Sequence, residues 1–431
     1  MQANKMSGWT TTSGRPVKVQ RQLGAGGQGE VHLVEVGNKS FALKRYHAQA
    51  ATTDQRAIIK QLIHNGPPAP YFLWPLELVE SAGNAFGYIM ELREPRFRPF
   101  EDLMARRVDP TFRALLTAGL QLADGFFQLH AKGLCYRDIS FGNVFFDPNT
   151  GDIRICDNDN VDISGAAPAG VLGTPRFMAP EVVRGEASAS AETDRYSLAV
   201  LLFYLLMGGH PLDGAREARI RCLDLPAMNV LYGKEPIYIF DPSDASNRPV
   251  PGLHDNPQLF HPLYPEGIQK LFLQSFTTGL HYPTQRVMES QWRKEFARAR
   301  DALLYCKSCR AQCFYDVRWL QAGQSRSCWR CQRALSLPPR LRIDGAVVML
   351  NHDTQLFAHH LGEDFDFGQP VAEVVQKPND PSQWGLRNLS QERWTLTRPD
   401  GSSADVLTGN SVPLVPGNII QFGRVRGELG I

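Results

Sequence analysis

The sequence lacks several features that mark particular classes of protein. Its longest apolar run, LAVLLFYLLM at 198–207, falls far short of the roughly 18 residues that a membrane-spanning helix needs. The polar N-terminus has no apolar segment after its first lysine, so we expect no signal peptide, no membrane association and a cytoplasmic protein. The formal net charge is only +2 for 431 residues, which gives no general reason to expect binding to nucleic acid.

Cysteine is scarce and unevenly placed. Only eight cysteines occur in 431 residues, and four of them form two C-x-x-C pairs in one region. This pattern suits a metal site in a reducing compartment better than a disulfide framework. The other bulk values, 43% hydrophobic and 21% charged residues, are ordinary for a folded chain. A chain of this length is expected to form two to four domains of about 100 to 200 residues each.

Hydrophobic periodicity divides the first 304 residues into two parts. Alternating apolar residues predict three antiparallel strands within 17–48 and two more within 74–92, with a helix around 53–65 between them. An amphipathic stretch predicts a long helix over 111–132, and the pattern stays mostly helical thereafter. The expected divisions are a tail at 1–16, a strand-rich lobe at 17–93 and a larger helical lobe at 94–304.

The composition changes beyond residue 304. The cysteine pairs lie within 305–337, and short apolar segments separated by glycine, proline, asparagine and aspartate fill 338–431. This rhythm predicts an all-β sandwich or barrel. The whole chain is therefore expected to be α+β, with a small cysteine-bearing module and an all-β domain after the two lobes.

A glycine-rich segment, LGAGGQGEV, lies between two of the predicted strands. It places Gly24, Gly26 and Gly29 in G-x-G-x-x-G order ahead of Val31. Glycine is needed where backbone amides approach phosphate oxygens without side chains in the way. A dinucleotide-binding motif would join a strand to a helix, so that interpretation is disfavoured. A plain glycine-rich hairpin turn and a hairpin that covers a bound nucleotide both remain open.

A second set of polar residues follows the long predicted helix. In CYRDISFGNVFFD four residues separate Asp138 from Asn143, and in IRICDND the residue Asp157 ends a predicted strand. Aspartate and asparagine are common in surface turns. The same residues also suit a catalytic loop, because an aspartate can accept a hydroxyl proton while magnesium takes a few oxygen ligands beside phosphates. Lys44, in the strand segment FALK, is either solvated or directed at such phosphates.

Six motifs stand in the order and at the spacing of one family. They are LGAGGQGEV, FALK, CYRDISFGN, ICDND, GTPRFMAPE and the pair of TDRYSLAV with HYPTQR. Jointly they resemble the motifs of the Hanks-type Ser/Thr protein kinases over 17–304. The resemblance implies a bilobal protein-kinase fold that transfers the γ-phosphate of ATP to Ser or Thr hydroxyls of proteins, its own included.

The resemblance also implies roles for individual residues. Asp138 would be the catalytic base, and Lys44 would contact the α- and β-phosphates of ATP. Asn143 and Asp157 would bind Mg²⁺ or Mn²⁺. The residues expected to contact the nucleotide are Gly24, Gly26, Gly29, Val31, Ala42, Lys44, Met90, Glu91 and Leu92.

Three supporting contacts follow from the same resemblance. Glu181 and Arg286 would form a buried ion pair with a structural role. Asp194 would bond the backbone of the catalytic loop, and Thr174 would contact Asp138.

The sequence departs from the family's pattern in four motifs: the catalytic-loop histidine, the lysine after the base, the D-F-G triplet and the helix glutamate. The family's catalytic-loop histidine, the lysine two residues after the base, and the D-F-G phenylalanine and glycine correspond here to Tyr136, Ser140, Asn158 and Asp159. No glutamate occurs between Lys44 and Pro70, and the position of the family's helix glutamate is taken by Gln55. A neutral amide can hydrogen-bond a lysine but cannot pair its charge. These departures keep a second hypothesis open, a pseudokinase scaffold that binds nucleotide or partner proteins without phosphotransfer.

The cysteine pairs match the zinc-ribbon pattern. Cys306 and Cys309 precede an 18-residue spacer, which is followed by Cys328 and Cys331. Two tight turns of this kind present four thiolates tetrahedrally, so a structural Zn²⁺ is expected. Basic and aromatic residues in the same module could bind nucleic acid, but a solvated cationic face is the favoured interpretation.

The last predicted domain resembles the second half of a forkhead-associated (FHA) β-sandwich, on the segments WGLRNLSQERWTLTRPDG and SVPLVPGNIIQFG. The residues with which that family binds phosphothreonine cannot be placed here, so we expect an FHA-like domain that serves protein contacts. The combination of domains is similar to the kinases of tellurite-resistance operons. That likeness implies a metal-dependent phosphatase and von Willebrand-type proteins as partners, besides the protein substrates.

Overall fold

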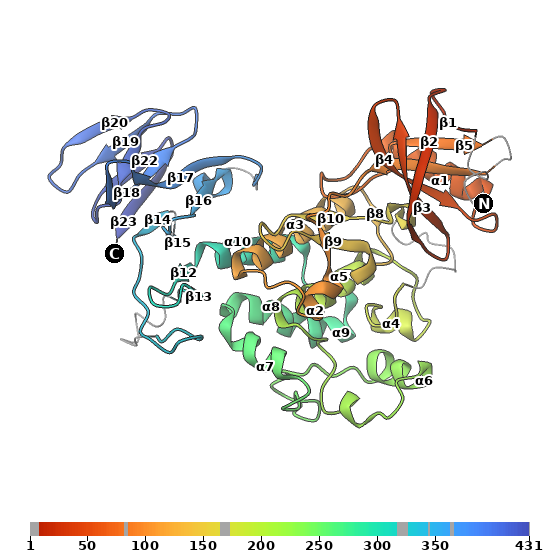
Figure 1. Ribbon diagram of the computed structural model, residues 1–431. Coiled ribbons are helices and arrows are strands. Elements are labelled where there is room, and N and C mark those ends of the chain that lie inside the picture. The colour runs from red at the N-terminus through yellow and green to blue at the C-terminus, as the bar shows by residue number, and fades with distance from the viewer. Residues whose placement is uncertain are drawn as a thin grey trace. The chain divides into compact units, whose positions relative to one another are not determined.

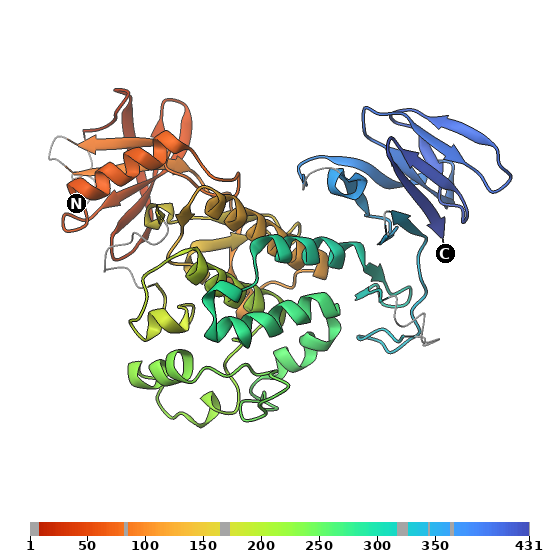
Figure 2. The same ribbon diagram turned by 180° about the vertical axis from the view of Figure 1, so that it is seen from behind.

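The computed structural model describes residues 8–81, 85–163, 173–316, 326–343, 345–362 and 366–430. The chain divides into two compact units, drawn in Figure 1 and from behind in Figure 2. The first unit comprises Met1–Pro262 and Glu266–Phe296, and the second comprises Leu263–Pro265 and Ala297–Ile431. None of the helices formed by the described residues has the length and apolar character that a membrane crossing requires.

A closed antiparallel barrel begins the first unit. Its strands follow the order β1-β2-β3-β4-β6-β5. Their bounds are β1 Trp9–Thr11, β2 Pro16–Ala25, β3 Gly29–Val36, β4 Lys39–Tyr46, β5 Glu77–Ser81 and β6 Phe86–Glu91. Val34, Leu43 and Ile89 are buried in its core, and burial alternates along the second half of β3, whose side chains point in turn to the core and away from it. The helix α1, Thr53–Asn65, follows β4, so the strands and the helix predicted here are confirmed.

Part of the expected N-terminal tail belongs to the barrel. The three residues of β1 pair with β2 and β5, and the side chain of Trp9 is only 3% exposed. A strand of three residues is too short to show an alternating pattern, so hydrophobic periodicity does not predict it. Residues 1–7 of the expected tail lie outside the described residues.

Two long helices organise the helical lobe. α3, Phe112–Ala131, begins where the side chain of Thr111 accepts a hydrogen bond from the amide of Ala114. α5, Ala191–Met207, begins at a capping box formed by Ser190 and Thr193 and buries nearly its whole length. The apolar run at 198–207 is therefore a core helix, as predicted. Figure 1 also labels the shorter α-helices, which are α2 Phe100–Met104, α4 Pro180–Val183, α6 Leu225–Met228, α7 Asp255–Phe260, α8 Glu266–Phe276, α9 Thr278–His281 and α10 Glu289–Asp301.

Short strands hold the polar segments of this lobe together. β8, Leu134–Cys135, pairs with β11, Asp162–Ile163. β9, Val144–Phe146, pairs with β10, Ile153–Ile155, and with β7, Arg98–Pro99. Because the amide of Cys156 also bonds the carbonyl of Asn143 at 2.9 Å, the segments that carry Asp138 and Asp157 lie next to each other.

The regular secondary structure of the second unit is mostly β-strand. The hairpin β12 Leu303–Tyr305 and β13 Gln312–Phe314 comes first. One sheet then has the order β15-β14-β23-β22-β19-β20 and the other has the order β16-β17-β18-β21. Their bounds are β14 Arg340–Ile343, β15 Ala346–Met349, β16 Gln355–Phe357, β17 Pro370–Lys377, β18 Asp380–Asn388, β19 Trp394–Thr397, β20 Ser403–Val406, β21 Ser411–Pro413, β22 Ile419–Phe422 and β23 Val425–Gly430.

Both sheets contribute to one apolar core. Leu341 and Trp394 from the first sheet and Leu356 and Leu386 from the second belong to a single buried cluster. Two sheets that share one core form a sandwich. The all-β prediction for this part of the chain is confirmed.

Candidate active site

The glycine-rich segment forms the turn between β2 and β3. The amide of Gly26 bonds the carbonyl of Gly29 at 2.8 Å and closes this turn. A Cβ atom on Gly29 would lie 2.1 Å from the carbonyl oxygen of Arg45, so the pairing of β3 with β4 requires glycine there. A Cβ on Gly24 or Gly26 would meet nothing within 4 Å. Protein contacts therefore explain the third glycine, whereas the first two leave open space beside the turn.

The strands next to this turn bring the other candidate nucleotide contacts together. Val31 on β3 is paired with Lys44 on β4, and Ala42 on β4 is paired with Met90 on β6. Ala42 and Met90 are buried, while Glu91 and Leu92 are exposed where the chain leaves the barrel. The predicted nucleotide-binding residues thus lie on the four neighbouring strands β2, β3, β4 and β6 and on the segments that follow β2 and β6.

Lys44 is buried between two carboxylates. Its Nζ atom lies 2.7 Å from Oδ1 of Asp157 and 2.8 Å from Oδ1 of Asp159. Gln28, in the glycine turn, offers its side-chain oxygen at 3.4 Å. Burial alone would lower the pKa of Lys44, but the charges of Asp159 and Asp157 outweigh it and raise the pKa above its usual value. Lys44 is therefore a charged ammonium held in place.

Asp138 is held by its neighbours on both carboxylate oxygens. Oδ1 accepts hydrogen bonds from the amide and the hydroxyl of Thr174, at 3.1 and 2.8 Å. Oδ2 accepts from Nδ2 of Asn143 at 3.2 Å, and the same amide group bonds the carbonyl of Asp138 at 2.8 Å. The predicted contact of Thr174 with Asp138 is confirmed. Since Nδ2 of Asn143 is engaged, its Oδ1 atom is the one left to bind a cation.

The backbone ahead of Asp138 is fixed from below by Asp194, at the start of α5. Its carboxylate accepts hydrogen bonds from the amides of Tyr136 and Arg137, at 2.5 and 3.1 Å, as predicted. His130, on α3, bonds Asp194 at 3.1 Å and Glu289 at 2.7 Å. Burial would lower the pKa of His130, but these two carboxylates outweigh it and raise the pKa to about 9. The charged ring therefore links three helices beneath the loop.

Tyr136 occupies the position where the motif has histidine. Its side chain is fully buried, and its hydroxyl donates a hydrogen bond to the carbonyl of Cys156, directly before Asp157. Asp157 itself has a positive φ of 58°, which a non-glycine residue rarely adopts. The tyrosine thus replaces the histidine as a packing residue, and it joins the Asp138 segment to the Asp157 segment.

Glu181 and Arg286 form the predicted buried ion pair. Two hydrogen bonds of 2.7 and 2.8 Å join the guanidinium to the carboxylate. Arg286 also bonds the carbonyls of Gly279 and Glu192. The pair connects α4 with the start of α5 and with α9, so its role is structural.

Comparison with known proteins agrees with this arrangement. The family model described as "Protein kinase domain" matches residues 17–245, just over half of the chain. The chain belongs to the protein kinase family. The barrel with α1 and the helical lobe are accordingly the two lobes of a kinase domain.

Curated relatives match the same region of the chain. "Serine/threonine-protein kinase pkn2" of Myxococcus xanthus is 32% identical over 215 residues, which cover 46% of this chain and 25% of that protein. "DNA damage-responsive serine/threonine-protein kinase RqkA" of Deinococcus radiodurans is 29% identical over 212 residues, 46% of this chain and 30% of that protein. "Probable serine/threonine-protein kinase CCRP1" of Zea mays is 28% identical over 201 residues, which cover 45% of this chain and 32% of that protein. The match spans only a quarter to a third of the length of these relatives.

The site contains one residue whose role the motifs do not predict. In the sequence Asp159 marks the loss of the D-F-G glycine, but in the structure its side chain is buried against Lys44. Gln55, on α1, instead bonds the hydroxyl of Tyr46 at 3.2 Å and the carbonyl of Asp159 at 3.5 Å. The available signal was the gain of a carboxylate two residues after Asp157 in a chain that lacks the helix glutamate.

The second unit of the chain holds the cysteine cluster. The Sγ atoms of Cys306, Cys309, Cys328 and Cys331 all lie within 4.8 Å of one another. The pairs Cys306–Cys331 and Cys309–Cys328 are each 3.6 Å apart. A tetrahedral zinc site with bonds of about 2.3 Å needs sulfur atoms about 3.8 Å apart. The four thiols therefore fit a zinc ion.

The backbone supports the same interpretation. After each C-x-x-C pair the chain turns alike, since the amide of Arg310 bonds the carbonyl of Cys306 and the amide of Gln332 bonds that of Cys328, both at 2.9 Å. Arg310 and Gln332 have positive φ angles of 64° and 60°. The predicted pair of tight turns is confirmed. Residues 317–325, which belong to the spacer, lie outside the described residues.

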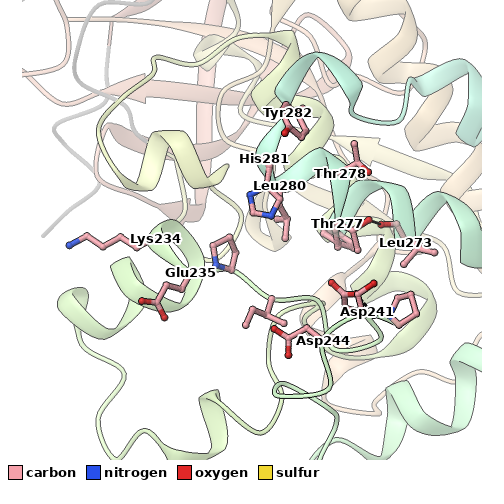
Figure 3. Close-up of a pocket in the computed structure, with 15 residues that line it drawn as sticks. Lys234, Glu235, Asp241, Asp244, Leu273, Thr277, Thr278, Leu280, His281 and Tyr282 are labelled. Atoms are coloured by element: carbon pink, nitrogen blue, oxygen red, sulfur yellow. Dashed lines mark hydrogen bonds between the residues drawn. The ribbon is translucent and has the colours of Figure 1, made fainter.

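A separate hollow of about 610 Å³ opens in the helical lobe. Figure 3 shows Glu235, Asp241 and Asp244 from the segment before α7 on one side of it, and Thr278 and His281 from α9 on the other. None of the residues that line it is among the predicted catalytic, nucleotide or metal residues. It is therefore distinct from the candidate active site.

Proposed function

We propose that this kinase transfers the γ-phosphate of Mg-ATP to Ser and Thr hydroxyls of proteins, its own included. The observation that carries the proposal is the joint placement of Asp138, Asn143, Asp157 and a charged Lys44 around one site. Asn143 and Asp157 would hold Mg²⁺, and the ion would neutralise negative charge on the transferred phosphate.

Asp138 is suited to the part of catalytic base. Its carboxylate is fixed by Thr174 and Asn143, so it needs no rearrangement to face an incoming hydroxyl. It would orient that hydroxyl and accept its proton as the oxygen attacks the γ-phosphate. Lys44 would position the α- and β-phosphates, and the glycine turn would cover them with backbone amides.

The test is transfer of labelled phosphate from Mg-ATP by the pure chain, alone and with a generic basic substrate protein. General base catalysis contributes about 10²- to 10⁴-fold, so Asp138→Asn should lose at least about 100-fold in rate. Lys44→Ala should also abolish measurable transfer. Asp152→Asn is the matched control, because this aspartate pairs with Arg96 in a partly exposed ion pair.

One result would favour the pseudokinase hypothesis instead. If the wild-type chain transfers no label but binds nucleotide tightly, and if Asp138→Asn binds it equally well, phosphotransfer is excluded. The observation that favours this alternative is the neutral Gln55 at the position of the family's helix glutamate.

The cysteine cluster is proposed to hold one structural Zn²⁺. Metal analysis of the purified chain should then give about one zinc per chain. Removal of zinc by a strong chelator, or the change Cys309→Ser, should unfold the 305–337 module while the kinase domain keeps its melting transition. A metal-free chain that melts like the untreated one would contradict this assignment.

The C-terminal sandwich is proposed to be an FHA-like domain that makes protein contacts, with the phosphatase and von Willebrand-type proteins as partners. The two-sheet architecture supports an FHA-like fold. Binding of the intact chain to these partners, lost when surface residues of the sandwich are changed and kept in Asp138→Asn, would support the proposal. Binding that survives such changes would refute it.

A further inference from the structure

The charge of Lys44 requires an anionic partner inside the protein. Its side chain is 5% exposed, and burying an unpaired ammonium is very costly. In protein kinases a glutamate of the helix after this strand forms the pair. Here the only acidic residue of α1 is Asp54, which is exposed in its first turn. The counter-charge must come from another element.

Asp159 has the surroundings of a residue built for this purpose. Its side chain is fully buried, and its Oδ1 atom accepts hydrogen bonds from Lys44 at 2.8 Å and from the hydroxyl of Tyr88 at 3.1 Å. Its Oδ2 atom accepts from the hydroxyl of Tyr46 at 2.5 Å. Both oxygens are thus satisfied, as a buried carboxylate requires.

The two carboxylates at Lys44 differ in their access to solvent. The side chain of Asp157 is 38% exposed, whereas that of Asp159 is 0% exposed. A cation that enters the site can reach Asp157 but not Asp159. Asp159 therefore keeps its ion pair with Lys44 when a cation binds Asp157.

We propose that Asp159 replaces the missing helix glutamate as the positioning partner of Lys44. The proposal rests on the proposed phosphotransfer and names a residue that this reaction needs. It also moves the pair from α1 to the segment after β10. Gln55 then serves only to fix Tyr46 and the backbone of Asp159, so a displacement of α1 does not carry away the charge that Lys44 depends on.

The first test compares Asp159→Asn with the control Asp152→Asn in the full chain. Asparagine keeps the shape but removes the charge, and losing a charged hydrogen bond should lower kcat/KM for Mg-ATP by about 30-fold. Asp152→Asn should stay within about twofold. Equal activity of Asp159→Asn and wild type, with both folded by thermal melting, would overturn the proposal.

The second test moves the charge back to the helix. Asp159→Gly should lower kcat/KM for Mg-ATP. The double variant Asp159→Gly with Gln55→Glu should have a kcat/KM at least about tenfold higher than Asp159→Gly alone, because the new carboxylate enters the space that the aspartate left. This comparison also stands if Asp159→Asn does not fold. A double variant that is no more active than Asp159→Gly would count against the proposal.

The affinity for a fluorescent ATP analogue with Mg²⁺ shows whether the proposed phosphotransfer fails or only the proposed role of Asp159 fails. If wild type transfers no phosphate, the proposed function fails. Even then Asp159→Asn should weaken nucleotide binding by about tenfold relative to Asp152→Asn, with recovery in the double variant. Unchanged affinity in all variants would refute the positioning role by itself.

Discussion

The two charged centres of the site are held in different ways. Asp138 is fixed by Asn143 and Thr174, with Asp194 beneath its loop, and the contacts of Thr174 and Asp194 follow from the motifs. Lys44 is fixed by Asp159, which the motifs gave no reason to expect there. The comparison shows that the geometry of a catalytic loop depends on residues at a fixed spacing in the sequence. The partner of a buried charge, in contrast, can come from any helix, strand or loop that lies next to that charge in the fold.

The largest loss of stability is expected at the buried Glu181–Arg286 pair of the helical lobe. Arg286→Ala would leave the carboxylate of Glu181 buried without its partner, which typically costs about 3–5 kcal/mol. Urea denaturation of the intact chain measures this loss. Lys270→Ala, which breaks the exposed pair with Glu266, is the control and should cost less than about 1 kcal/mol. Similar losses for both variants would show that the buried pair is not structural.

The helix junction beneath the loop should depend on pH. The pKa of His130 is raised to about 9 in the folded chain, against roughly 6.5 when unfolded. Its stabilising contribution is therefore complete below about pH 6.5 and is lost as the pH rises through 9, by up to about 3 kcal/mol. Wild type should lose stability over this window relative to His130→Gln, measured by urea denaturation at both ends. Parallel pH profiles would contradict the charged state of His130.

The kinetic effects of the two sides should also differ. Asp194→Asn replaces one of the carboxylate oxygens that accept from the backbone amides of Tyr136 and Arg137. We expect kcat to fall by about 10- to 100-fold with little change in KM for Mg-ATP, because only the catalytic loop is displaced. If KM for Mg-ATP rose as much as kcat fell, the effect of Asp194→Asn would not differ from the effect expected on the Lys44 side, and the proposed difference between the two sides would be wrong.

The smallest effects are expected in the glycine turn. Gly29→Ala would place a Cβ 2.1 Å from the carbonyl oxygen of Arg45 and should cost about 1–3 kcal/mol of stability. Gly24→Ala meets nothing within 4 Å and should keep its stability within about 0.5 kcal/mol, yet weaken Mg-ATP binding. Equal melting temperatures for the two variants would show that β3 and β4 can separate at Gly29.

α1, α3 and the all-β character of the last domain could be predicted from the spacing of their apolar residues, and the barrel strands from their short apolar segments between glycine turns. α5 could be predicted from its continuous apolar run, which suits a helix buried on all sides. β1 could not, since three residues carry no period. In the site, Thr174, Asp194 and the Glu181–Arg286 pair followed from the motifs. The role of Asp159 did not, because it depends on Tyr46 and Tyr88 on two strands far away in the sequence. A neutral Gln55 alone suggested an unpaired lysine, whereas the fold supplies the charge from another segment.

The most direct test of the account is an experimental structure of the chain with Mg²⁺ and a non-hydrolysable ATP analogue. The account predicts that Lys44 keeps its hydrogen bond to Asp159 and contacts the phosphates, while Asp157 binds the metal ion. A structure in which Lys44 leaves Asp159, or pairs with a residue of α1, would contradict it.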